Sequence, residues 1–467
     1  MKTIIKRELL DHLQSIQFIV LLVFSITLFS ANGIIFAKKF RQVDSTFQQR
    51  TAGSQPHPDT QIIFLFRQSN PYLFLAEGGD LDRPSAYFLM AKGYFSASSA
   101  FLSRDYKLPD IPKLDWSFII KTIFSLYVIL LGYAAVSGEK EEGTLRLVLS
   151  NPVGRVRFLA GKYIAILCAA LVPLLAGCLV SSVILAIVLP QILTFDTVSR
   201  ILFLLLLSAA YLSLFAFLSL LVSSLIRRSS IALLVLLAVW VVFIVLIPDI
   251  SGILAQKLAK VPSDYQTAKN LGPFVQKEVW DKINGIQARI DRGELRTEEA
   301  VKAEAEKAYE SGQEKLRFYE KNYEDSVAQR ARLARDLSRL SPIALFQYAA
   351  DDIALSGIHG EEEFLKNISS YSKIYDAYVM KKTGKLISQS NWMFSSSVKV
   401  DGKSIDLHSP QPEAYRGDMS DFPKFVERPA RLSEAVRYAL GDIAGLLVWN
   451  ILLAGLAFSM FLRSDVR

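Results

Sequence analysis

Cysteine and histidine are scarce in this chain, with two and four copies among 467 residues. Cys168 and Cys178 lie in one hydrophobic run, about 15 Å apart if that run is helical, which is too far for a disulfide. The histidines show no spacing typical of metal ligands, and the serines lack the sequence context of a hydrolase nucleophile. The histidines are His12, His57, His408 and His359, the last interpreted as part of a surface cluster with three glutamates. The sequence therefore predicts no metal site, no cofactor site and no catalytic centre in this chain.

The chain also lacks a nucleotide-binding loop. Gly154 to Lys162 comes nearest to the G-x-x-x-x-G-K-[ST] pattern, but its spacing is wrong and no serine or threonine follows the lysine. Charge is nearly absent from the interiors of the hydrophobic runs, whereas carriers driven by protons or sodium keep ionisable groups there. Lys121 and Asp442 are expected near the outer ends of their runs, where side chains reach water. These absences exclude a P-loop ATPase in this chain and argue against an ion-coupled carrier.

Long hydrophobic runs dominate what is present, and the mean hydropathy is +0.28. Six runs are about 20 residues long or longer, enough to cross roughly 30 Å of hydrocarbon. They cover residues 17–36, 117–137, 160–189, 199–226, 230–249 and 442–462. The first run is too long for a signal peptide and lacks its small-residue cleavage site. The expected fold is a mainly α membrane protein with six transmembrane helices and a large extracytoplasmic α/β insertion that contains a long helical hairpin.

Lysine and arginine gather in the short segments outside these runs, which indicates how the chain is oriented. These segments are the head (Lys2, Lys6, Arg7), the stretch 137–162 (Lys140, Arg146, Arg155, Arg157, Lys162), the loop Arg227-Arg228 and the tail (Arg463, Arg467). With six spans all four fall on one side, predicted to be the cytoplasm, although Lys38, Lys39 and Arg41 disagree locally. The net charge of +8 is mostly explained by these basic segments on one side of the membrane. Because no aromatic and basic motif accompanies it, no nucleic-acid partner is expected.

The spans divide the chain into segments on the two sides of the bilayer. The head has apolar residues at helical spacing between charged ones, which predicts an amphipathic helix in the membrane interface. The predicted order is this interfacial helix at 1–16, a transmembrane helix at 17–36, an extracytoplasmic mixed segment at 38–116, a transmembrane helix at 117–137, a cytoplasmic segment at 138–158, three transmembrane helices within 160–249, an extracytoplasmic domain at 250–441, a transmembrane helix at 442–462 and a cytoplasmic tail at 463–467.

Short β signals occur in both extracytoplasmic segments. Residues 61–66 and 72–75 are typical of strands, with a turn between them. Residues 398–407 alternate around Asp401-Gly402, which predicts a β-hairpin.

The larger extracytoplasmic segment also predicts a helical hairpin. Apolar residues recur at helical spacing over 280–290, and Gly293 is a typical helix stop. Thr297 is a typical N-cap for a second helix that runs to about Leu340. The turn between the helices is a candidate surface for an extracytoplasmic protein, and the alternative is a packed helix pair with no partner. The candidate residues are Gly293, Glu294, Leu295 and Arg296.

The segment from Gly138 to Arg157 is polar and charged, and it joins the second and third runs. Its acidic residues come first, leucines follow, and Pro152 ends the helical pattern. Arginines precede the next span. This order predicts a short amphipathic helix along the membrane face that offers a surface to a soluble partner. The alternative is anchoring at the membrane surface without a partner.

This segment resembles the cytoplasmic loop of ABC exporter permeases of the type-2 class. The matching residues are Glu141, Glu142, Gly143, Thr144, Leu145, Pro152, Val153, Arg155, Gly161 and Lys162. Further matches lie at Leu340-Ser341-Pro342, Tyr348 to Ala354, Asp418 to Phe425 and Phe461 to Arg467, and they resemble a subgroup with a large domain between the fifth and sixth spans. The resemblance implies a second permease copy or paralogue, two copies of a separate ATPase subunit that binds ATP and Mg, and residues 138–153 as the coupling helix.

The function expected from these observations is that of a permease subunit of an ATP-driven exporter. The expected location is the bacterial inner membrane, with both termini in the cytoplasm. The candidate ATPase-coupling residues are Glu139, Glu141, Glu142, Gly143, Thr144, Leu145, Leu147, Pro152 and Arg155. Two alternatives are a mechanotransmission subunit that drives an extracytoplasmic partner without moving cargo, and a membrane-anchored scaffold or sensor.

Overall fold

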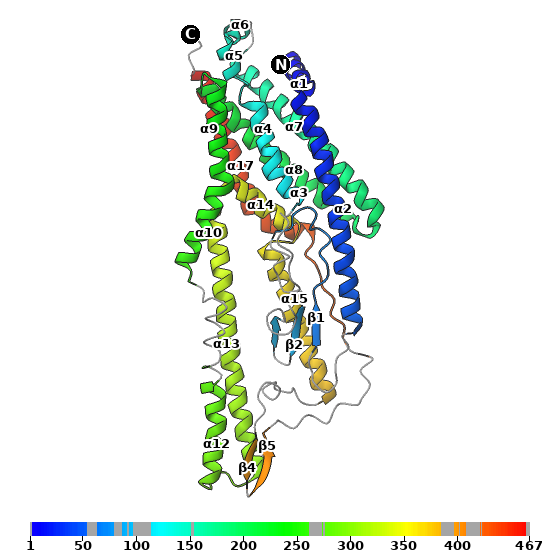
Figure 1. The fold of residues 1–467 in the computed structure, drawn as a ribbon, viewed down its shortest axis with the longest axis vertical. Coiled ribbons are helices and arrows are strands. Elements are labelled where there is room, and N and C mark those ends of the chain that lie inside the picture. The colour runs from blue at the N-terminus through cyan, green and yellow to red at the C-terminus, as the bar shows by residue number, and fades with distance from the viewer. Residues whose placement is uncertain are drawn as a thin grey trace.

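The computed structural model of the protein describes residues 2–53, 63–78, 86–90, 93–96, 114–150, 154–260, 273, 276–383, 397–400, 402–407, 421 and 423–463. These residues form an elongated molecule with a helical bundle at one end and two separate extensions beyond it (Figure 1). The N-terminal helix and the end of the last helix both lie at the bundle end, which we call the proximal end. The tip of the longer extension marks the distal end.

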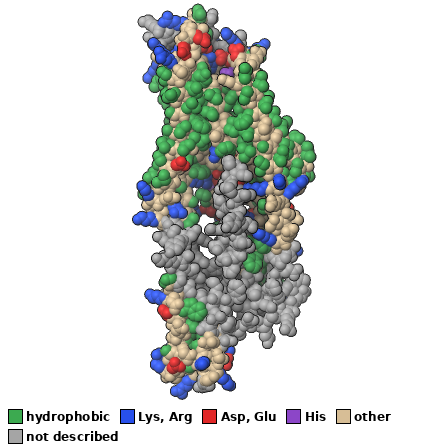
Figure 2. Space-filling view, in the orientation of Figure 1, with side chains coloured by type: hydrophobic (Ala, Val, Ile, Leu, Met, Phe, Trp, Pro, Cys, Tyr) green, Lys and Arg blue, Asp and Glu red, His purple; other side chains and the backbone are tan. Residues whose placement is uncertain are grey.

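Six helices among the residues described are long and apolar enough to cross a membrane. In chain order they are α2 (Ile16–Gly53), a helix built from α3 (Trp116–Phe118), η2 (Ile119–Phe124) and α4 (Ser125–Gly132), then α7 (Arg155–Val188), α8 (Phe195–Leu225), a helix built from α9 (Ser229–Val241), η4 (Val242–Leu246) and α10 (Ile247–Leu258), and α17 (Leu432–Arg463). Hydrophobic side chains cover this part of the surface, and charged side chains gather beyond it at both ends (Figure 2). The prediction of a mainly α membrane protein with six spans is confirmed.

Two spans reach well outside their hydrophobic runs. α2 continues to Gly53, and α17 already begins at Leu432. The extension of α2 carries the basic residues that disagree with the predicted orientation. One of them, Arg41, donates a 2.6 Å hydrogen bond to the carbonyl of Val188 at the end of α7. A carbonyl in the last turn of a helix has no intrahelical donor, so Arg41 satisfies a group that the helix itself leaves open.

The first distal unit is a small antiparallel sheet packed on a helix. The sheet has the order β1-β2-β3 and α15 covers one of its faces, with bounds β1 (Ile63–Phe66), β2 (Ala86–Met90), β3 (Gly93–Ser96) and α15 (Ile358–Thr383). Ile63 and Leu65 are buried against Phe364 of α15, whereas Phe64 between them is 45% exposed. This alternation is the period of a strand with one buried face. The strand predicted at 61–66 is confirmed over its described part.

The strand predicted at 72–75 is wrong. These residues form a turn in which the N–H of Leu75 donates to the carbonyl of Tyr72 at 2.9 Å. Phe74 and Leu75 are fully buried, and the Phe74 ring lies 5.3 Å from that of Trp116 at the start of the second span. The apolar run therefore packs as a turn into the distal end of the bundle, where two consecutive residues are buried instead of every second one as in a strand with one buried face.

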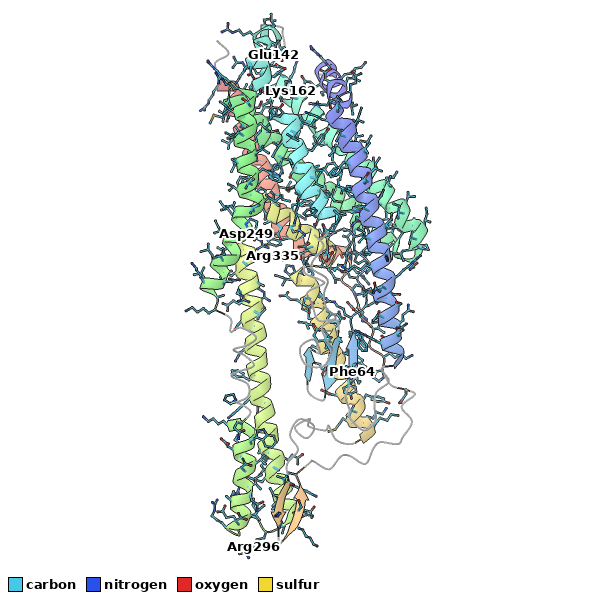
Figure 3. The ribbon with its side chains drawn as sticks, in the orientation of Figure 1. Phe64, Glu142, Lys162, Asp249, Arg296 and Arg335 are labelled. Carbon is cyan, nitrogen blue, oxygen red and sulfur yellow. The ribbon has the colours of Figure 1, made fainter. Side chains whose placement is uncertain are left out.

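The second distal unit is a long arm that extends the fifth span (Figures 1 and 3). It contains η5 (Gln276–Trp280), α12 (Asp281–Asp291), α13 (Glu298–Ser338), β4 (Ser397–Val400) and β5 (Lys403–Asp406). α13 has 41 residues and is about 60 Å long. It packs against α10 near the bundle and against α12 near the tip, where Arg296 marks the distal end (Figure 3).

The turns of this arm lie where the sequence predicts a helix end, an N-cap and a hairpin turn. Gly293 ends α12 with φ +74°, a left-handed conformation that favours glycine. The Thr297 hydroxyl accepts a hydrogen bond from the N–H of Ala300 and caps α13. Gly402, also at positive φ, follows β4 in the predicted β-hairpin. The tip has a small hydrophobic core of its own, formed by Ile283, Ile286, Leu295, Val301, Ala305, Ala308, Val398, Val400, Ile405 and Leu407.

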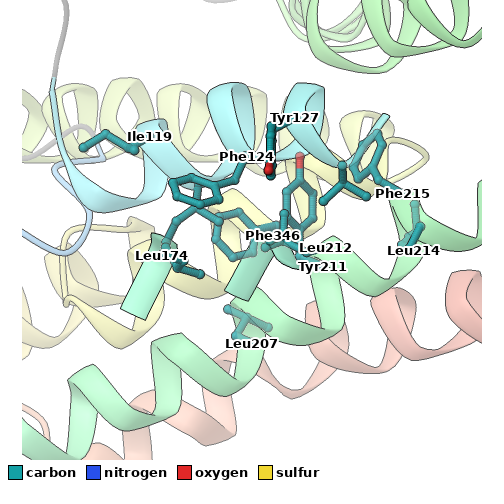
Figure 4. Packing of buried hydrophobic residues seen from close by; sticks show 14 of the residues in the cluster. Ile119, Phe124, Tyr127, Leu174, Leu207, Tyr211, Leu212, Leu214, Phe215 and Phe346 are labelled. Atoms are coloured by element: carbon teal, nitrogen blue, oxygen red, sulfur yellow. The ribbon is translucent and has the colours of Figure 1, made fainter. Parts of the chain in front are cut away.

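Helix α14 (Pro342–Ile353) joins the arm to the bundle. Its N-cap is Ser341, and the proline at its first position favours a helix start. Phe346 of α14 stacks on Tyr211 of α8 with ring centroids 4.4 Å apart, inside the main core (Figure 4). Elsewhere in this core, helices cross at glycines: a Cβ on Gly132 would lie 2.0 Å from the Ser219 hydroxyl. Small residues let membrane helices approach closely, so the bundle is tightly packed around α8.

Candidate functional site

The segment between the second and third spans lies at the proximal end, beside the N-terminal helix α1 (Lys2–Leu13) (Figure 1). It forms two helices, α5 (Ser137–Glu141) and α6 (Thr144–Ser150). The single amphipathic helix expected here is therefore wrong. Gly143 has φ +75° and breaks the helix, because this left-handed conformation is open to glycine and strained for other residues.

The inner face of this segment is held on the fourth span. The backbone N–H groups of Val136 and Ser137 both donate to the hydroxyl of Ser223 at 2.9 Å. Lys140 donates to the carbonyl of Ser224. Leu145 of α6 is 2% exposed and belongs to the main core. These contacts fix the segment to the end of α8.

The opposite face of the segment is open. Leu147 is 70% exposed, and Glu142 and Gly143 are exposed beside it. Glu142 is labelled near the proximal end of the molecule in Figure 3. This face is therefore accessible to a soluble protein.

The structure separates the predicted coupling residues into two groups. Glu142, Gly143 and Leu147 face outward, whereas other predicted residues bind within the chain. The Glu141 carboxylate accepts hydrogen bonds from the N–H and hydroxyl of Ser229, so it caps the fifth span. Thr144 donates to the Glu139 carbonyl at 3.3 Å, Arg155 donates to the Leu462 carbonyl at 2.8 Å, and Pro152 lies outside the described residues.

Glu139 points inward to a lysine that the sequence analysis used for the membrane orientation and for the family resemblance, but not as a partner of Glu139. Lys162 of α7 is 4% exposed, and its Nζ lies 2.7 Å from Glu139 and 2.8 Å from Glu8 of α1. A buried lysine needs an anionic partner. The sequence signal that could have located this contact is the position of Lys162 within the third span, together with the acidic residues of the two nearest polar segments.

The predicted residues at the distal tip mostly stabilise their own turn. Leu295 is 8% exposed and belongs to the core of the tip. The Glu294 carboxylate accepts from Arg292 at 2.6 Å and from Arg289 at 3.2 Å. Arg296 donates to the carbonyl of Gly293. These contacts explain why the turn is ordered, and its charged side chains remain exposed.

A second buried charge network lies where the arm meets the bundle (Figure 3). Arg335 of α13 bridges Asp352 of α14 and Asp442 of α17, with both N–O distances 2.7 Å. The two carboxylates are fully buried in the structure. The expectation that Asp442 reaches water is therefore wrong, because α13 brings arginines to it.

Further groups complete this second network. Arg339 donates to Asp442 at 2.7 Å, and His359 lies 3.0 Å from Asp352. The His359 ring also stacks on Tyr438 of the sixth span, so this histidine is half-buried and not part of a surface cluster. The network therefore joins α13, α14, α15 and α17. Within the described ranges, no group of three or more histidine, cysteine, aspartate or glutamate side chains is arranged to bind a metal ion.

Comparison with known proteins addresses the family of the chain. A search of curated proteins gave no match. The family described as "ABC-2 family transporter protein" matches residues 2–466, nearly the whole chain. This match confirms the family prediction, while the subgroup with a large outer domain stays a prediction. With its six apolar helices, this chain is a multi-pass membrane protein that belongs to the ABC-2 transporter family, as a permease subunit of the kind that works with an ATPase subunit.

Proposed function

We propose that this chain is the permease subunit of an ATP-driven exporter and that a separate ATPase subunit docks on α5 and α6. The observation that carries this proposal is the exposed face of Leu147 and Glu142, on a segment that is fixed to several spans. α5 is continuous with the second span, binds the end of the fourth and caps the fifth. A push on this face would therefore tilt several spans together.

The proposed complex has two ATPase subunits, and ATP and Mg bind there. A second permease copy or paralogue completes the path through the bilayer. We place the proximal end in the cytoplasm and the arm outside a bacterial inner membrane, in line with the basic residues at the proximal end. The apolar spans suit a lipidic, hydrophobic or polymeric cargo.

Co-purification tests the proposal. The full-length chain, tagged and extracted from its own cells, is expected to bring down a P-loop ATPase in stoichiometric amount. Leu147→Asp, Glu142→Lys or Gly143→Trp should lose this ATPase while the permease still inserts. Phe318→Asp is the matched control, because Phe318 on the arm is 68% exposed and should leave the ATPase bound. A partner that lacks a P-loop, or full retention by all three docking variants, would contradict the proposal.

Mechanotransmission is the second candidate, and the Arg335 network favours it. This network fixes the base of α13 to the sixth span, and α13 carries a tip with its own hydrophobic core. An arm built in this way would transmit a tilt of the span to an extracytoplasmic protein, without cargo. Spin labels on the tip and on α17 distinguish the two candidates: an ATP-dependent movement of the tip in a complex that moves no cargo supports mechanotransmission. If no ATPase is bound at all, the scaffold or sensor becomes the better explanation.

A further inference from the structure

Lys162 lies at the base of the third span, between two carboxylates that come from different segments. Its Nζ is 2.8 Å from Glu8 of α1 and 2.7 Å from Glu139 of α5. It also lies 5.2 Å from the centre of the Phe158 ring. The lysine is 4% exposed, whereas the two glutamate side chains are 24% and 20% exposed. One cation thus joins the N-terminal helix to the docking segment.

The surroundings make this contact depend on Lys162. His12 of α1 also faces the site, but burial lowers its pKa, which disfavours the protonated ring as a second cation there. One carboxylate oxygen of Glu139 is buried without a hydrogen-bond partner in the described part of the chain. Two glutamates held together in a partly dry site repel each other unless a cation separates them. Loss of the lysine charge would therefore separate α1 from α5.

A rigid joint connects α1 to the first span. The Ser15 hydroxyl donates to the carbonyl of His12 at 2.7 Å, and it accepts from the N–H of Phe18 at 3.2 Å. Ser15 therefore ends one helix and caps the next. A movement of α1 is passed to α2, which runs the full depth of the bundle and contacts β1 of the first distal unit.

We propose that Lys162 is a positioning residue that latches the N-terminal helix to the docking segment, so that a push on α5 and α6 moves the first span together with the second. This inference takes the source of the push from the proposed function, but the latch itself is a property of the permease alone. It is tested in two steps, the first of which needs no partner.

The first step measures the latch in the purified full-length permease in lipid nanodiscs. Spin labels are attached at Leu10→Cys on α1 and Ser150→Cys on α6, two exposed positions. Cys168 is partly exposed and is replaced by alanine so that it takes no label, whereas Cys178 is buried and can stay. The unmodified latch is expected to give one narrow distance. Lys162→Gln should lose this narrow distance, and Lys162→Arg should keep it. Asp11→Asn is the control, because Asp11 also lies on α1 but is 68% exposed.

The measured distances can either support or overturn the latch. If Lys162→Gln fails to insert, Glu8→Gln and Glu139→Gln each remove one contact and keep the lysine, and each should broaden the distance. An unchanged narrow distance in all inserted variants overturns the latch. A change in Asp11→Asn as large as in Glu8→Gln also overturns it, because the effect would then belong to charge on α1 in general.

The second step uses the complex with the co-purified ATPase. Glu8→Gln is expected to bind the ATPase in unchanged amount but to reduce the stimulation of ATP hydrolysis by the permease about tenfold, within the usual range of coupling between sites. Bound ATPase with unchanged stimulation overturns the latch as a coupling element. If no ATPase co-purifies with the unmodified chain, the proposed function fails, and the distances alone decide on the latch.

Discussion

At each end of the bundle one basic side chain lies between two carboxylates, but the residue types and their burial differ between the two ends. At the proximal end one lysine, Lys162, joins two glutamates that remain about one-fifth to one-quarter exposed. At the distal end Arg335 joins two aspartates that are fully buried, and Arg339 and His359 add further contacts. Both networks connect helices that lie far apart in the chain.

The two networks differ in the type of cation and in burial, and both differences affect how strongly each network holds its helices together. A guanidinium presents several donors in a fixed plane, whereas an ammonium on four methylenes is a point charge with freedom to turn. Buried charges are also costly to separate from their partners, while partly hydrated ones can return to water. The distal joint is thus expected to hold the arm on the sixth span with a large energy, and the proximal joint is expected to hold α1 to the docking segment with a smaller one.

Removal of the distal arginine should have the largest effect. Arg335→Met leaves two dry aspartates without their shared cation, which should lower the free energy of unfolding by about 3–5 kcal/mol. Thermal unfolding of the purified protein measures this loss. If the unfolding midpoint stays unchanged, the distal network does not hold the arm with the large energy described above.

Removal of the proximal lysine should cost less. Lys162→Met leaves two glutamates that can turn towards water, so the expected loss is about 1–3 kcal/mol. The same unfolding assay compares the two variants directly. A loss equal to that of Arg335→Met would show that the two joints contribute equally to stability and would remove the distinction between them.

A third buried carboxylate extends the comparison, because its side-chain partner is a neutral amide and not a cation. Asp351 of α14 accepts a 2.7 Å hydrogen bond from Gln347, and burial raises its pKa to about 7. A carboxyl whose pKa is raised by folding contributes stability below its unfolded pKa, and that contribution is lost as the pH rises to about 7. Asp351→Asn mimics the protonated form, so it should raise the unfolding midpoint by about 2–4 °C more at pH 8 than at pH 5. An equal shift at both pH values would contradict the assignment.

An exposed ion pair on the arm should have the smallest effect. Arg332 lies on α13 close to Arg335 and pairs with Glu362, but its side chain is 61% exposed. Arg332→Ala is expected to change the free energy of unfolding by about 0–1 kcal/mol. This variant serves as the matched control for Arg335→Met, since both remove an arginine from the same helix.

Local features of this protein were largely predictable. The six spans follow from hydropathy, and the turn at Gly293 and the cap at Thr297 follow from residues adjacent in the chain. The strand predicted at 72–75 failed for a tertiary reason, since this turn packs into the distal end of the bundle and buries Tyr72, Phe74 and Leu75. The break at Gly143 was missed because the acidic residues before it and the leucines after it were interpreted as the start and the body of one helix.

The position of the candidate site in the chain could be predicted, but the directions of its side chains could not. The segment 138–150 was correctly singled out as polar between two spans, yet nothing in its local pattern separates Glu139, which faces Lys162, from Glu142, which faces outward. Glu141 likewise caps the fifth span through Ser229, a residue of a later segment. These roles depend on the neighbours that each carboxylate meets after folding.

The amino-acid sequence by itself determined that this chain crosses a membrane, where its spans lie and which segment joins the second to the third. These properties depend on hydrophobic length and on backbone preferences, which residues close in the chain decide. Only the tertiary structure decided which charges meet. Lys162 and Glu8 are 154 positions apart, and Arg335 and Asp442 are 107 positions apart. The reason is physical: the energy of an ion pair depends on the distance and hydration of its two groups in space, and packing of the helices sets both.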